Sequence, residues 1–282
     1  MRIKIGDSWL FFDVEGAKLR PDGPNMKEVP TVLLLHGGPG FDHSTFKPVM
    51  SALADVAQLV YLDHRGQGRS DRVSPDWCRL TNWADDVKDF CDALEIKRPV
   101  VMGHSFGGVV TMMYATRHPS HPAKIILSSS PARIRRDRIY QAFERVGGKQ
   151  AREAAERFWE NPCAETGAEY ARVCWPLYSR SATLADPDVT SRMRFNHKLG
   201  LRFFNGEGRT FDLLDDLSRI ECPTLLLAGE DDPVSPIEDA ADITGRIPAG
   251  LLHFVRFANA GHGVFRDDPQ RAVQVIREFV TN

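Results

Sequence analysis

The chain of 282 residues is long enough to bury a sizeable core and suits one large α/β domain, with or without an insertion. Apolar residues make up 42% and charged residues 26%, the proportions of an ordinary globular protein. The net charge of −2 argues against nucleic acid or an anionic membrane as a partner, because such partners favour a basic excess.

Cysteine usage and the N-terminal sequence bear on the compartment. The five cysteines include no C-x-x-C pair, which argues against a metal site or a disulfide framework and favours a reducing compartment. Residues 1–16 lack the sustained apolar run and cleavage site of a signal peptide, and no stretch approaches membrane-spanning length. We therefore expect a cytoplasmic protein that acts on a small molecule, and the sequence does not indicate its oligomeric state.

Six short, nearly continuous apolar runs predict strands that helices cover on both faces. They lie at residues 31–38, 58–66, 99–105, 124–130, 223–230 and 251–257. Helical patterns occupy 81–96, capped by Thr81 or Asn82, then 106–119, then the C-terminal segment that begins at Asp268 and Pro269. This alternation predicts an α/β fold with a mostly parallel, doubly wound sheet.

The segment between Ser130 and Pro223 interrupts the alternation. It contains no convincing strand, is too long for a loop, and shows helical patterns at 139–148, 151–160 and 188–204. We interpret 131–212 as a helical cap inserted between two parts, 1–130 and 213–282, of one core domain.

Residues 103–107 read G-H-S-F-G, with a predicted strand before them and a predicted helix after them. Glycines on both sides of Ser105 permit a sharp strand-to-helix turn that exposes the serine hydroxyl above the sheet. The helix begins there, so the backbone N–H of Phe106 would face a developing oxyanion. The motif alone is weak, because any glycine-rich turn could produce it.

An acid and a histidine follow Ser105 in the order that a serine nucleophile requires. The acid is Asp231 or Asp232, and we prefer Asp232 because it fits a G-x-x-D-x-x-x-P spacing. The histidine is His262, which lies between two glycines after the last predicted strand. The sequence thus predicts a Ser105–His262–Asp232 catalytic triad, with His262 as general base and then acid.

The second oxyanion donor is expected from the H-G-G-P-G loop at 36–40. We favour the backbone N–H of Gly38, with Gly37 as the alternative. No metal site or dinucleotide motif is evident, and we expect no cofactor. Aromatic residues of the insertion are candidates for the substrate pocket, although they could equally form the core of the cap. They are Trp159, Trp175, Tyr178, Phe195 and Phe203.

Four motifs together resemble the α/β-hydrolase family, and within it the proline iminopeptidase-like branch. They are H-G-G-P-G at 36–40, D-H-R-G-Q-G-R-S-D at 63–71, G-H-S-F-G-G at 103–108 and G-E-D-D-P-V-S-P at 229–236. They span most of the chain in matching order. The resemblance implies the α/β-hydrolase fold, a helical cap over the active site, serine hydrolysis and no cofactor.

Two departures from that branch bear on the substrate. Its members usually carry G-G-S-W-G-G at the elbow, where this chain has His104 and Phe106 in place of the second glycine and the tryptophan. They also bind the free amine of the substrate through cap glutamates, one of them in R-I-E-N-H-Y-F. The loosely matching stretch here is R-F-N-H-K-L at 194–199, which places Phe195 where that glutamate should be. Phenylalanine cannot pair with an ammonium group.

The sequence therefore favours a cofactor-free serine hydrolase, acting on a small ester or lactone such as an N-acyl-homoserine lactone. An aminopeptidase that removes N-terminal proline is the alternative, with Glu160, Glu165, Glu169 or Glu207 in place of the missing carboxylate. A non-catalytic ligand binder is a third hypothesis, although a binder has no need of all three triad members. Epoxide hydrolase or dehalogenase chemistry is disfavoured, because it typically requires an aspartate at position 105.

Overall fold

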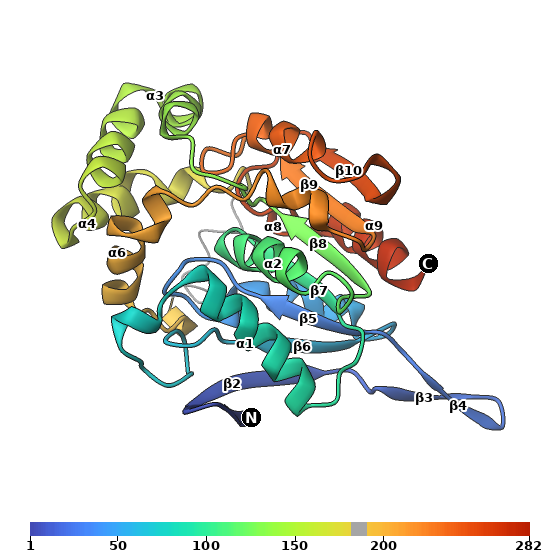
Figure 1. The fold of residues 1–282 in the computed structure, drawn as a ribbon. Coiled ribbons are helices and arrows are strands. Elements are labelled where there is room, and N and C mark those ends of the chain that lie inside the picture. The colour runs from blue at the N-terminus through green and yellow to red at the C-terminus, as the bar shows by residue number, and fades with distance from the viewer. Residues whose placement is uncertain (182–190) are drawn as a thin grey trace.

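The computed structural model describes residues 1–181 and 191–282, and Figure 1 shows a central sheet with helices on both faces. Eight strands form the main sheet in the order β1-β2-β6-β5-β7-β8-β9-β10. Their bounds are β1 Arg2–Ile5, β2 Ser8–Glu15, β5 Thr31–Leu35, β6 Gln58–Leu62, β7 Val100–His104, β8 Lys124–Ser128, β9 Thr224–Gly229 and β10 Leu252–Phe257. The β1–β2 and β2–β6 pairs are antiparallel and the others are parallel. The predicted fold class is confirmed.

Two apolar layers cover the sheet, one on each face. Leu33 and Leu35 of β5 belong to the layer shared with α1, α2 and α7. Val32 and Leu34 belong to the layer shared with α8 and α9, as the alternation of side chains along a strand requires. The helices of the two layers are α1 Leu80–Ala93, α2 Phe106–Arg117, α7 Ile237–Thr244, α8 Val264–Asp267 and α9 Pro269–Thr281.

The N-terminal strands were not predicted. β2 alternates buried and exposed residues in its first half, and β3 (Leu19–Asp22) pairs with β4 (Asn25–Glu28) in an exposed hairpin. None of them is a continuous apolar run. Conversely, the expectation that residues 251–257 are buried on both faces is wrong, because β10 is an edge strand whose one buried residue is Phe257.

The two predicted N-terminal helix caps had different outcomes. α9 begins as predicted, with the Asp268 side chain capping it and Pro269 in the first turn. The prediction that Thr81 or Asn82 caps α1 is wrong, because α1 already begins at Leu80. The backbone N–H of Leu80 donates to the Glu207 carboxylate at 2.8 Å, so a residue distant in sequence caps this helix.

The inserted segment is helical in its described part. α3 (Arg136–Glu160) spans two of the predicted helices with a non-helical Gly148 between them, and α4 (Ala164–Val173) follows. Of the predicted helix at 188–204, residues 188–190 lie outside the described residues. Residues 193–196 are not helical, because the Asn196 side chain caps α6 (His197–Asn205). Figure 1 shows α3, α4 and α6 together, near the carboxyl ends of β8 and β9. The boundaries at 131 and 212 remain a prediction.

The cysteines and the described helices agree with a protein that lacks disulfides and a membrane-spanning helix in the described ranges. All five cysteines are free. Within the described ranges, no three His, Cys, Asp or Glu side chains are grouped so as to hold a metal ion. The helices of those same ranges include none with the length and apolar character needed to cross a membrane.

Candidate active site

Ser105 stands at a sharp turn between β7 and α2. Its φ of 53° and ψ of −121° form a conformation that residues other than glycine rarely adopt. A Cβ at Gly107 would lie 2.0 Å from the carbonyl oxygen of Leu35, and one at Gly103 would lie 2.2 Å from that of Gly107. The two glycines are therefore required by close backbone packing.

His262 joins Ser105 to Asp232 through its two ring nitrogens. Nε2 lies 2.9 Å from the hydroxyl oxygen of Ser105. Nδ1 lies 2.9 Å and 3.1 Å from the two carboxylate oxygens of Asp232. Because an ionised carboxylate only accepts hydrogen bonds, Nδ1 carries the ring proton and Nε2 offers its lone pair to the serine hydroxyl.

The structure brings Asp232, rather than Asp231, to the histidine. Asp232 is fully buried, and its Oδ1 also accepts hydrogen bonds from the backbone N–H groups of Val234 at 2.8 Å and Ser235 at 2.9 Å. The Asp231 carboxylate instead lies 3.4 Å from the guanidinium of Arg180. Two backbone donors thus fix the orientation of the Asp232 carboxylate.

The insertion also contacts His262. The carbonyl oxygen of Tyr178 accepts a hydrogen bond from the His262 backbone N–H at 2.6 Å, and the two rings lie 5.1 Å apart. The Tyr178 hydroxyl is hydrogen-bonded to that of Tyr170 at 2.9 Å. The inserted segment therefore helps to position the histidine.

The glycine loop at 36–40 packs beside Ser105. A Cβ on Gly37 would lie 3.2 Å from the Cβ of Ser105. His36 donates from Nδ1 to the Gly37 carbonyl at 2.8 Å, while its Nε2 accepts from the backbone N–H of His64 at 3.2 Å. Burial lowers the pKa of His36, which keeps the ring neutral and Nε2 an acceptor. Since C=O and N–H point in opposite directions across a trans peptide, the Gly38 N–H is turned away from His36.

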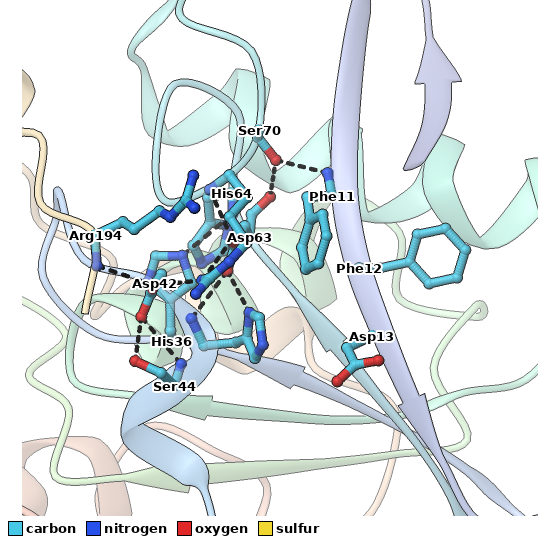
Figure 2. A network of polar contacts seen from close by, with 12 residues as sticks. Phe11, Phe12, Asp13, His36, Asp42, Ser44, Asp63, His64, Ser70 and Arg194 are labelled. Carbon is cyan, nitrogen blue, oxygen red and sulfur yellow. Dashed lines mark hydrogen bonds and ion pairs between the residues drawn. The ribbon is translucent and has the colours of Figure 1, made fainter. Parts of the chain in front are cut away.

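Figure 2 shows the polar network around this loop, centred on two buried carboxylates. Asp42 accepts from the Arg69 guanidinium at 2.6 Å and from the backbone N–H of Arg194 at 3.0 Å. Asp63 accepts from the backbone N–H and Nδ1 of His43 at 2.9 Å and 2.6 Å. Although burial opposes it, hydrogen bonding by His43 holds the pKa of Asp63 below its ordinary value. The network ties the glycine loop both to the core and to the inserted segment.

Ser105 and His262 line a cavity of about 530 Å³. The two predicted oxyanion residues, Gly38 and Phe106, line it as well. So do all the aromatic candidates of the insertion, which are Trp159, Trp175, Tyr178, Phe195 and Phe203. Trp159, Trp175 and Tyr178 also pack in the apolar cluster of the insertion, so they contribute to its core as well as to the cavity wall. Sequence reasoning missed Phe41, Phe158, Phe204 and Phe211, although the Phe203–Phe204 pair was a signal for one of them.

The described wall of the cavity carries very little charge. Among the described residues that line it there is no aspartate or glutamate, and Arg266 carries the one permanent positive charge. The glutamates that could have replaced the missing amine-binding carboxylate are not in the wall. Glu160 pairs with Arg136 at 3.0 Å, Glu169 pairs with Arg157 at 2.7 Å, and Glu207 caps α1.

Comparison with known proteins identifies the family. Residues 30–269 match the family model described as alpha/beta hydrolase fold. The chain belongs to the α/β-hydrolase family. The resemblance that the four motifs predicted is thereby confirmed.

Relatives of this α/β-hydrolase include peptidases, esterases and carbamate hydrolases by name. The proline iminopeptidase PfmaB of Pestalotiopsis fici is 27% identical over 282 residues, covering 96% of this chain and 98% of that protein. A thermophilic esterase from Thermogutta terrifontis superposes with a TM-score of 0.74 at 26% identity, covering 100% and 98% of the two chains. A proline iminopeptidase of Mycobacterium smegmatis superposes with a TM-score of 0.77 at 21% identity, covering 100% and 97%. Family and relatives identify the chain as a hydrolase.

Proposed function

We propose that this α/β-hydrolase is a cofactor-free serine hydrolase that cleaves small carboxylic esters or lactones, N-acyl-homoserine lactones among them. One observation carries the proposal. The hydrogen-bonded series Ser105–His262–Asp232 meets a cavity whose described wall is largely apolar, with many aromatic rings, and contains no carboxylate. Such a wall suits an apolar acyl group better than an ammonium group.

The acylation step follows from the geometry. The Ser105 hydroxyl oxygen attacks the carbonyl carbon while Nε2 of His262 takes its proton. Asp232 holds the ring in the required tautomer and stabilises the imidazolium. The backbone N–H groups of Gly38 and Phe106 donate to the developing oxyanion, a contribution worth about 10²–10³ in rate for each donor.

His262 then completes the reaction. It passes its proton to the leaving oxygen, which departs as an alcohol or, for a lactone, stays attached as a hydroxyl group. Water then enters, gives a proton to His262 and attacks the acyl-enzyme. When the proton returns to the Ser105 oxygen, the acid is released and the enzyme is regenerated.

An aminopeptidase that releases N-terminal proline is the second candidate, favoured by the names of the relatives. It requires a carboxylate that binds the substrate amine. Phe195 stands at the loosely matching position and stacks on Trp175 and His197, with ring centroids 6.0 Å and 5.4 Å away. The ester or lactone is therefore the better fit to the described wall.

The test compares a short-chain acyl ester, an N-acyl-homoserine lactone and a prolyl arylamide, with the wild type and Ser105→Ala. We expect ester or lactone turnover to dominate and to vanish in the variant. Dominant prolyl arylamide turnover would favour the aminopeptidase. Labelling of the wild type, but not of Ser105→Ala, by a fluorophosphonate separates an enzyme from a non-catalytic binder.

A further inference from the structure

Arg266, on α8, lines the cavity that Ser105 and His262 share. Its polar contacts within the described residues are with neutral groups. Nη2 donates to the carbonyl oxygen of His262 at 2.7 Å and lies 3.3 Å from Nε2 of His104. Nε is buried and has no hydrogen-bond partner. The guanidinium is therefore a cation without a partner anion in the described part of the chain.

No neighbouring carboxylate of the described residues forms an ion pair with this guanidinium. His104 contacts the Ser128 carbonyl through Nδ1 at 3.2 Å, so its Nε2 is the acceptor that faces Arg266. Burial, together with the Arg266 charge, holds the pKa of His104 well below its usual range, so the ring is neutral. The adjacent carboxylate, Asp267, instead accepts hydrogen bonds from the chain at 179–181 and from the Gly261 N–H at 2.7 Å.

Burying the charge of Arg266 is energetically unfavourable, and the glycine at position 263 leaves space for the guanidinium. Burial lowers the pKa of Arg266 to about 10, although the charges of Asp267 and Asp232 oppose this shift. A Cβ at position 263 would lie 2.4 Å from Nη2, so Gly263 is what allows the guanidinium to lie there. The guanidinium also lies over the Phe265 ring, 5.0 Å from its centroid.

A second side chain with an unpartnered polar atom lines the same cavity. The hydroxyl oxygen of Thr45 is buried without a hydrogen-bond partner, and Thr45 lines the cavity. The ring of the next residue, Phe46, lies 5.6 Å from that of Phe265 and 6.5 Å from that of His104. Two side chains that each have an unpartnered polar atom, one of them cationic, thus line an otherwise largely apolar cavity.

We infer that Arg266 and Thr45 form a carboxylate-binding subsite, and that the preferred substrates are esters with a carboxylate close to the scissile bond. The inference rests on the proposed ester hydrolysis. A guanidinium donates two parallel hydrogen bonds to a carboxylate, and burial strengthens the pair. Because Arg266 holds the backbone of His262, which protonates the leaving oxygen, we place the carboxylate on the leaving alcohol.

Two matched substrate pairs test this. Butyryl glycolate and butyryl glycolamide differ only in a carboxylate or amide on the leaving group. Monoethyl succinate and ethyl succinamate carry the same difference on the acyl group. We expect the wild type to prefer butyryl glycolate over its amide, and Arg266→Met to lower that ratio of kcat/KM about 10- to 100-fold. Thr45→Val should lower it about 3- to 10-fold.

The variants have matched controls. Arg266→Lys keeps the charge and should retain part of the preference, and it replaces Arg266→Met if the latter does not fold. Arg180→Met removes a charge that pairs with Asp231 and does not line the cavity, and should leave the ratio within about twofold. If the wild type prefers the carboxylate only in the succinate pair, the subsite is supported, but it binds a carboxylate on the acyl group instead of the leaving alcohol.

Several results would overturn the subsite. One is a wild-type ratio near unity in both substrate pairs with good turnover of all four esters, which leaves the proposed function intact. A second is that Arg266→Met lowers kcat/KM equally for the acid and the amide of each pair, as a purely positioning residue would. A third is that Arg180→Met changes the acid-to-amide ratio as much as Arg266→Met does.

If the wild type hydrolyses neither esters nor lactones, the proposed function fails, and binding decides the subsite. Butyryl glycolate should then raise the Tm of Ser105→Ala more than butyryl glycolamide does. That difference should disappear in Ser105→Ala/Arg266→Met, and its absence in Ser105→Ala would overturn the subsite.

Discussion

Replacing Asp232 with asparagine would trap His262 in the wrong tautomer, and the structure shows why. Oδ1 of Asp232 is held by the N–H groups of Val234 and Ser235, so the oxygen of an asparagine would remain there. Its NH₂ group would then occupy the place of Oδ2 and donate to Nδ1 of the histidine. Nε2 would carry the proton and could no longer accept one from the serine. We expect kcat for a neutral ester to fall about 10⁴-fold.

The assay is steady-state hydrolysis of a short-chain acyl ester, with folding checked by circular dichroism. KM should change little, because Asp232 does not line the cavity. Asp231→Asn is the matched control, since that carboxylate is partly exposed and pairs with Arg180, and it should cost less than about threefold. A loss below tenfold in Asp232→Asn, or an equal loss in Asp231→Asn, would refute the assignment.

Three further predictions concern packing and pH. Phe203 is buried and lines the cavity, so Phe203→Ala should lower the free energy of unfolding in urea by about 3–5 kcal/mol and shift turnover toward longer acyl chains. Unchanged stability would contradict this. Gly107→Ala should yield no folded protein by circular dichroism, because its Cβ would lie 2.0 Å from the backbone oxygen of Leu35. Although Arg138 pairs with Asp239 at 2.7 Å and opposes the shift, burial raises the pKa of Asp239 to about 7 from 3.8. Its charge therefore destabilises the folded state increasingly as pH rises between these values. Asp239→Asn should therefore raise Tm by a few degrees at about pH 8 and hardly at about pH 4; an equal gain at both would contradict the assignment.

The sequence predicted best those strands whose burial is uniform. β5, β7 and β9 are buried along their whole length, so each appears as a continuous apolar run. β3 and β4 form a largely exposed two-stranded hairpin, and their amino-acid sequence resembles that of a loop. The start of α1 was misplaced for a different reason. Its cap, Glu207, lies far away in sequence, and no local pattern could reveal it.

The site residues, too, could be predicted only where the signal lies in the local sequence. Ser105 and the glycine loop depend on local backbone geometry, in which the spacing of glycines is itself the signal. Asp232 could be preferred over Asp231 only by spacing, because the deciding contacts with Val234 and Ser235 appear after the turn has formed. Arg266 carried no signal at all, since an arginine near the end of a chain is ordinarily exposed.

The glycine loop and the inserted segment also determine each other's positions. The backbone N–H of Asn196 donates to the Gly40 carbonyl at 2.7 Å, and the Gly40 N–H donates to the Gln67 side chain at 2.6 Å. A Cβ at Gly40 would lie 2.7 Å from the carbonyl oxygen of Asn196, so the two segments can approach only because residue 40 is glycine. Phe195 enters the cavity wall from this docked segment, with its ring 5.0 Å from that of Phe41. A substitution that displaces Asn196 would therefore alter both the cavity wall and the loop that carries Gly38, although the two are far apart in sequence.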